Sequence, residues 1–169
     1  MSDRILIRTA EMSDVPAIGA LHARVFGPGR FARSAYRVRE GRRDGNPLSD
    51  FCHVAVRGHR LVASVTLSEV KIGGVAGALL LGPIAVEPEF AGQGLGRQLI
   101  AEGVEDARSA GKSLVILVGD EPYYGRFGFH PVPPGQILLP GPVNPMRLLA
   151  FPLKEGAIEA ARGLVTSAF

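Results

Sequence analysis

A glycine-rich turn in the middle of the chain constrains the fold more than any other feature of the sequence. Residues 92–97 contain three glycines and stand between an apolar run, 75–86, and a segment whose apolar residues recur at helical spacing, 94–110. We therefore predict a strand that leads through the turn into a long amphipathic helix. The next run, 113–118, is continuously apolar, as in a central strand covered on both faces. Residues 79–118 thus predict a right-handed strand, helix and strand crossover, with its two strands parallel and adjacent.

The backbone of this turn predicts an anion-binding site. Amides in the first turn of a helix have no partner within the helix and lie at the positive end of its dipole. Glycines at 92, 94 and 96 would let a bulky phosphate reach these amides, and they also permit the positive φ angles that such turns often need.

Two other nucleotide-binding motifs fit the turn less well. A P-loop requires Gly-Lys followed by Ser or Thr, whereas Gly96 is followed by Arg97 and Gln98. A dinucleotide-binding fold places its glycines after the first strand and an acidic residue at the end of the next strand. Here the glycines come in the middle of the chain and not after its first strand, although Asp120 follows the second strand and keeps this alternative open.

The remaining pattern predicts one domain, residues 1–169, of mixed strands and helices. Gly82-Pro83 interrupts its apolar run and predicts a bulge or a splayed strand edge. Residues 131–145 are rich in proline and predict a surface loop, and 155–169 fit either a helix or a helix followed by an edge strand. Further strands are expected at 5–7, 52–57, 61–72 and 148–153, and further helices at 15–26, after a Ser13-Asp14 cap, and 122–127.

Charge and composition exclude several classes of protein. Six of the 19 basic residues fall within 30–43, which reads as a weak helix. We expect a solvated helix face there; the alternative is that these arginines attract an anionic substrate or cofactor phosphates. The rest of the chain is not basic, so a nucleic-acid partner is not expected. No run of about 18 uncharged apolar residues predicts a membrane span, and the single cysteine, Cys52, reads as a buried structural thiol, so we expect a cytoplasmic protein.

Two motifs between Leu81 and Phe129 together resemble the GCN5-related N-acetyltransferase (GNAT) family, and within it the YhbS-type branch. The first is the glycine turn itself, which opens the central helix, although Ala91 stands where the family usually has Gln or Arg. The second is a tyrosine four residues before a Gly-Phe pair, here Tyr124 before Gly128-Phe129.

This resemblance implies an α/β (α+β) fold with a mixed, mostly antiparallel sheet, a central parallel pair of strands that splay apart, and flanking helices. It implies acetyl-CoA as cosubstrate without a metal, and acetyl transfer to a primary amine of a small molecule or peptide by direct attack in a ternary complex. Whether the protein forms a homodimer stays open. The residues that the resemblance assigns to the cofactor are Ile84, Ala85, Val86, Gly92, Gln93, Gly94, Leu95, Gly96 and Arg97.

The catalytic residue implied by the resemblance is Tyr124, as the proton donor to the departing thiolate. The alternative is that Tyr123 and Tyr124 only pack their short helix against the sheet. A non-catalytic acyl-CoA-binding or sensor domain also stays open, because Ala91 departs from the motif and the strand 79–86 carries no ionisable side chain. Candidates for the base are Glu69, His53, Glu121 and His130, or water, whereas Glu87 and Glu89 are expected to be structural or solvent-facing.

Overall fold

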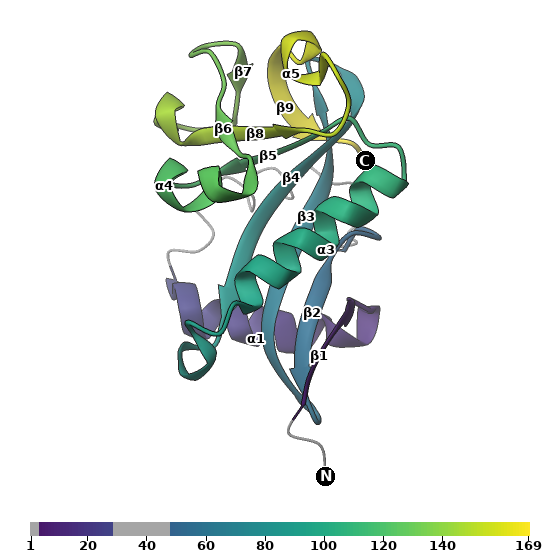
Figure 1. Ribbon diagram of the computed structural model, residues 1–169, viewed down its shortest axis with the longest axis vertical. Coiled ribbons are helices and arrows are strands. Elements are labelled where there is room, and N and C mark those ends of the chain that lie inside the picture. Colours follow the sequence, from purple (N-terminus) through teal and green to yellow (C-terminus); the bar gives the residue numbers. More distant parts are fainter. Residues whose placement is uncertain (1–3, 29–47) are drawn as a thin grey trace.

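The computed structural model describes residues 4–28 and 48–169 (Figure 1). The arginine-rich segment 30–43 lies outside the described residues, so the helix expected there and its role stay predictions.

A mixed, mostly antiparallel sheet forms the centre of the molecule. Its main strands are hydrogen-bonded in the order β1-β2-β3-β4-β5-β8-β6, while β9 pairs with β3 and β7. Only β4 with β5 and β7 with β9 are parallel among the described strands. The strands are β1 Ile5–Thr9, β2 His53–Arg57, β3 Arg60–Ile72, β4 Val75–Val86, β5 Leu114–Val118, β6 His130–Pro131, β7 Ile137–Leu138, β8 Leu148–Pro152 and β9 Gly163–Ser167.

Helices cover the two faces of this sheet unequally. The long helix α3 runs across one face, which we call the α3 face, and α1 lies on the opposite face, the α1 face (Figure 1). The α-helices are α1 Val15–Phe26, α3 Leu95–Ser109, α4 Glu121–Tyr124 and α5 Ala157–Ala160, and 3-10 turns occupy Met12–Asp14, Pro88–Phe90, Gly125–Phe127 and Pro145–Arg147.

The predicted periodicity of α3 is confirmed by its packing. Leu95, Leu99 and Ile100 are buried against strand residues of the α3 face, among them Leu67 and Leu79. On the α1 face, Ile18 and Leu21 of α1 pack with Val54 and Ala85. The upper part of that face is closed by residues 132–148, whose buried side chains pack against Leu80 and Ile116. The fold thus has two apolar layers, one on each side of the sheet.

Several segments outside the central crossover can be compared in detail with the predicted elements. Asp14 is the residue before α1, but its carboxylate accepts from the Glu11 N–H at 2.7 Å and from Arg8 at 2.7 Å, and no side chain caps α1 itself. Of the two forms expected for residues 155–169, the structure has a one-turn helix, α5, followed by strand β9. The proline-rich stretch begins with the second residue of β6 and contains the short strand β7, which pairs with β9. Cys52 is buried, as predicted.

Candidate cofactor and active site

The parallel pair β4 and β5 is joined along only part of its length. The pairing covers Ala78, Leu79 and Leu80 of β4 with residues 114–116 of β5, although β4 continues to Val86 and β5 to Val118. The β3–β4 register shifts at Gly82-Pro83, so the predicted interruption is a bulge. The two strands therefore part at their carboxyl ends, and we call this opening the splay.

The edge of β4 that faces the splay carries backbone groups without strand partners. The Glu87 N–H donates to the Val62 C=O of β3 at 2.8 Å. Because the amides of a strand alternate between its two edges, those of Ile84 and Val86 point away from β3 and into the splay. The expected cofactor edge, 84–86, thus has backbone donors and acceptors aimed at the space between the strands.

The glycine turn lies beside the same opening, at the N-terminus of α3. The Gln98 N–H donates to the Gly94 C=O at 3.1 Å, which is the first bond of the helix, and no side chain caps this end. The amides of residues 95–97 therefore have no partner within the helix. Free amides at a helix N-terminus are what an anion site requires, and the anion site itself stays a prediction.

Gly92 and Gly94 are required by the backbone of the turn. Their φ angles are 80° and 79°, in the left-handed region where side chains are strained. A Cβ atom built on either residue would meet no atom within 4 Å, so the space in front of the turn is open. Gly96 differs, because its φ is not positive and a Cβ there would lie 3.5 Å from the Tyr123 hydroxyl and 3.6 Å from Ile84 Cδ1.

Tyr124 follows the end of β5, on the other side of the splay from residues 84–86. Its side chain is half-buried and packs against the core of the α3 face. The ring lies edge-on to Phe129 with centroids 6.3 Å apart. It also packs directly against Gly119, where it occupies the space that a side chain at position 119 would need. Packing therefore holds the ring of Tyr124, the tyrosine of the family motif, in place beyond the carboxyl end of β5.

Residues 6–132 match the family model described as "Acetyltransferase (GNAT) domain". The chain belongs to the GNAT family. It is 29% identical over 162 residues to the uncharacterized N-acetyltransferase YhbS of Escherichia coli K12, with 95% of each chain covered.

Solved GNAT structures extend the likeness to the fold. The crystal structure of E. coli YhbS in complex with CoA has a TM-score of 0.82 and 30% identity, and covers 99% of this chain and 91% of that one. A GNAT acetyltransferase of Brucella melitensis in complex with acetyl-CoA has a TM-score of 0.66 and 29% identity, with 89% of this chain and 97% of that one covered. The predicted family and fold class are thus confirmed.

Two carboxylates that follow residues 84–86 in the chain have structural partners. Glu87 is buried, and its carboxylate accepts from Arg24 Nε of α1 at 2.8 Å, with Arg60 4.0 Å away. The exposed Glu89 accepts from Arg60, and this hydrogen bond lowers the pKa of Glu89 below its ordinary value. The ion pairs anchor the segment between β4 and α3 to its neighbours.

The four predicted base candidates fall into two groups. His53 is buried and lies 3.0 Å from Asp106, so it ties α3 to the sheet. Glu69 of β3 pairs at 2.5 Å with Lys112, which lies in the turn between α3 and β5. Glu121 and His130 instead form an exposed pair at 3.4 Å next to α4.

His22 of α1 is not among the residues that the sequence singles out. This histidine is buried, and its Nε2 lies 3.5 Å from the hydroxyl of Ser64, which pairs across the sheet with Ala85 of the cofactor edge. His22 stands within the apolar pattern of residues 15–26, and this position could have indicated that its side chain is buried.

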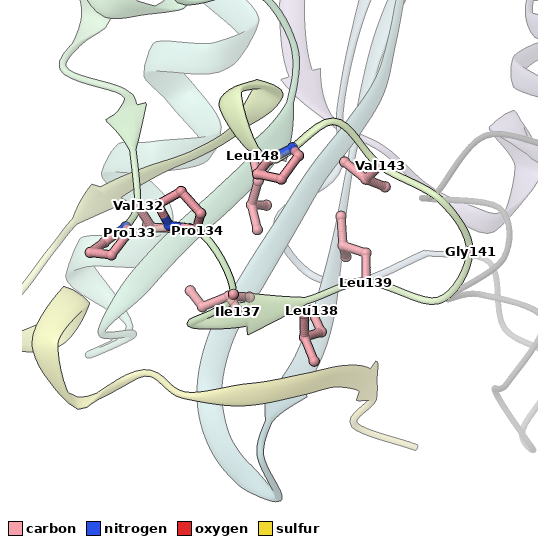
Figure 2. Close-up of a pocket in the computed structure, with 11 residues that line it drawn as sticks. Val132, Pro133, Pro134, Ile137, Leu138, Leu139, Gly141, Val143 and Leu148 are labelled. Carbon is pink, nitrogen blue, oxygen red and sulfur yellow. The ribbon is translucent and has the colours of Figure 1, made fainter.

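An apolar pocket of about 100 Å³ lies under residues 132–148 (Figure 2). Val132, Leu139 and Leu148 are among the side chains around it. Its lining holds no acid, base or charged group, so the pocket itself offers no proton transfer.

Features of other classes of protein are not seen in the described ranges, 4–28 and 48–169. No helix there is long and apolar enough to cross a membrane. Nor do three or more His, Cys, Asp or Glu side chains gather there as a metal site.

Proposed function

We propose that this GNAT protein transfers an acetyl group from acetyl-CoA to a primary amine of a small molecule or peptide. The observation that carries the proposal is the splay. Beyond Leu80 and Ile116 the parallel strands part, and the free backbone edge of β4 and the uncapped N-terminus of α3 lie beside one opening. The relatives solved with CoA and acetyl-CoA support the choice of cosubstrate.

The cosubstrate would bind mainly through the backbone. Its diphosphate would accept hydrogen bonds from the amides of the turn 92–97, and its pantetheine would pair with residues 84–86 in the manner of an added strand. Ala91 does not remove these hydrogen bonds, because backbone amides donate them whichever side chain stands at position 91.

The chemistry would be a direct displacement in a ternary complex. The amine nitrogen attacks the thioester carbonyl, the new C–N bond forms, and the C–S bond breaks. Negative charge on the carbonyl oxygen would be stabilised by a β4 amide that points into the splay. The thiolate would leave with a proton from Tyr124, and the attacking amine would lose its proton to water or to a base.

The alternatives are less well supported. A non-catalytic acyl-CoA-binding domain is suggested only by Ala91 and by the lack of an ionisable side chain on residues 79–86. The enzyme does not depend on either, because backbone amides bind the cosubstrate and water can take the proton. A dinucleotide-binding fold requires a doubly wound parallel sheet, which the mostly antiparallel order of this sheet does not provide. A cytoplasmic location forms part of the proposal, since the free, buried Cys52 is compatible with a reducing compartment.

Release of free CoA tests the proposal. Purified protein, acetyl-CoA and a broad panel of amines at pH 8 should yield thiol in amounts that depend on the amine. Acetyl-CoA binding should be measured separately by calorimetry. Tight binding without release for any amine would support a binding domain, and a preference for NADPH over acetyl-CoA would overturn the cosubstrate.

A further inference from the structure

The two adjacent tyrosines of α4 point to different parts of the molecule. Tyr124 packs against Phe129 and Gly119 at the end of β5. The hydroxyl of Tyr123 instead reaches across to α3, where it lies 3.5 Å from the position that a Cβ of Gly96 would occupy. The Ile84 side chain of β4 approaches the same point, with Cδ1 at 3.6 Å. Tyr123 thus brings a polar group to the place where the glycine turn and the cofactor edge meet.

The ring of Tyr123 is held in this position by its neighbours. It lies edge-on to the rings of Tyr124 and Phe127, with centroids 4.8 Å and 5.5 Å apart. Arg126 lies over the ring, with the guanidinium carbon 4.8 Å from the ring centroid, and Arg126 Nε donates to the Tyr123 C=O at 3.2 Å. These contacts hold the ring and place a cation next to it.

The polar groups of this cluster are available to a ligand. Among the described residues, the Tyr123 hydroxyl has no hydrogen-bond partner, and no carboxylate lies within 4.0 Å of Arg126. Arg97, in the first turn of α3, is exposed and likewise has no carboxylate partner in that part of the chain. Other arginines near the turn, Arg24 and Arg60, are engaged by Glu87 and Glu89.

We propose that Tyr123 and Arg126 extend the cofactor site and bind the diphosphate from a position beside the glycine turn. The Tyr123 hydroxyl donates a hydrogen bond to a phosphate oxygen whose other contacts are the amides at the start of α3. The guanidinium of Arg126 neutralises charge on the same group. This inference rests on the proposed function, since it requires a CoA ester at the splay.

The inference separates the roles of two neighbouring residues that share a motif. Tyr123 acts on binding, because a diphosphate contact is made equally in the ground state and the transition state. Tyr124 acts on turnover, because proton donation to the thiolate is needed only as the C–S bond breaks. The two conservative substitutions, Tyr123→Phe and Tyr124→Phe, are therefore matched controls for each other.

Calorimetric titrations with CoA and with 3′-dephospho-CoA test the inference. Tyr123→Phe and Arg126→Gln should each raise Kd about tenfold for both ligands, which is the effect of losing one hydrogen bond to a charged group. Both ligands should lose affinity equally, because both retain the diphosphate. Tyr124→Phe should leave both Kd values unchanged.

Three outcomes would contradict the inference. Unchanged Kd values for Tyr123→Phe would remove its hydroxyl from the site. A loss seen with CoA alone would place the contact on the 3′-phosphate, and a lowered kcat with unchanged KM for acetyl-CoA would make Tyr123 the catalytic tyrosine. If the wild-type protein binds neither ligand, the proposed function itself fails, which is a result distinct from all three. Circular dichroism of each apo variant verifies its folding, since the Tyr123 hydroxyl contributes no bond to another described residue.

Discussion

The Glu87 carboxylate lies 2.8 Å from Arg24 Nε, so the residue that directly follows β4 is tied to the last turn of α1. The side chain of Glu87 is only 7% exposed, whereas that of Arg24 is 52% exposed. The pair therefore joins a buried anion to a half-solvated cation, at the point where the chain leaves the sheet for the glycine turn.

Loss of this buried charge should cost more stability than loss of its exposed neighbour. Glu87→Gln removes the ion pair with Arg24 and leaves a buried amide, so we expect a loss of about 1–2 kcal/mol in the free energy of unfolding. Glu89→Gln is the matched control; its exposed pair with Arg60 should contribute less than the Glu87 pair, because solvent screens it. Urea unfolding measures both, and equal effects would contradict the structural role of Glu87.

The glycines of the turn should not tolerate alanine equally. Gly94→Ala places a side chain at a φ of 79° and should cost about 1–2 kcal/mol of strain, with weaker acetyl-CoA binding as the turn distorts. Gly96→Ala introduces only ordinary contacts, at 3.5 Å and 3.6 Å, and should retain more affinity. Gly94→Glu should abolish binding through bulk and negative charge. Calorimetry with acetyl-CoA ranks the three variants, and an unchanged Kd for Gly94→Glu would place the diphosphate elsewhere.

Substitution of the motif tyrosine should affect chemistry rather than binding. Tyr124→Phe keeps the ring that packs against Phe129 but removes the proton donor. We expect kcat to fall about tenfold or more while Kd for acetyl-CoA is retained. Steady-state kinetics with calorimetry on the same preparation checks this, and unchanged turnover would remove Tyr124 from the mechanism.

The ion pair of Arg8 with Asp14 should make stability depend on pH in the acid range. The hydrogen bond from Arg8 lowers the pKa of Asp14 in the folded protein. A carboxyl with a lowered folded pKa contributes stability above its unfolded pKa, about 3.9, and that stability is lost as the pH falls through the folded pKa. Unfolding in urea from pH 6 down to pH 2 should therefore show a smaller pH dependence for Asp14→Asn than for the wild type. The exposed Asp50→Asn is the control and should follow the wild type.

Features set by neighbours along the chain could be predicted from the sequence. The helix after the glycine turn follows from its apolar spacing, and positive φ at Gly92 and Gly94 follows from glycine itself. The interruption at Gly82-Pro83 predicts the bulge that the register shift of β3 and β4 confirms. Residues 155–169 stayed ambiguous, because the pairing of β9 with β3 depends on a strand almost 100 residues earlier in the chain.

The candidate site needed the tertiary structure at its critical points. Neither the partner of Glu87 nor the neighbour of Ser64 is near in sequence, since Arg24 and His22 lie on α1. The sequence placed Tyr123 and Tyr124 side by side and could not say which of them meets the glycine turn. Successive residues of a helix point about 100° apart, so the docking of α4 decides which ring enters the core and which hydroxyl reaches Gly96.

By itself, then, the sequence determined the local chemistry of this protein: a strand, an open glycine turn at a helix N-terminus and a family motif with a tyrosine. The tertiary structure alone decided where the parallel strands part, which amides face the opening and which side chains surround it. The physical reason is range. Backbone φ angles and helix periodicity are properties of a few consecutive residues, whereas strand pairing, ion pairs and packing join residues that only the folded chain brings together.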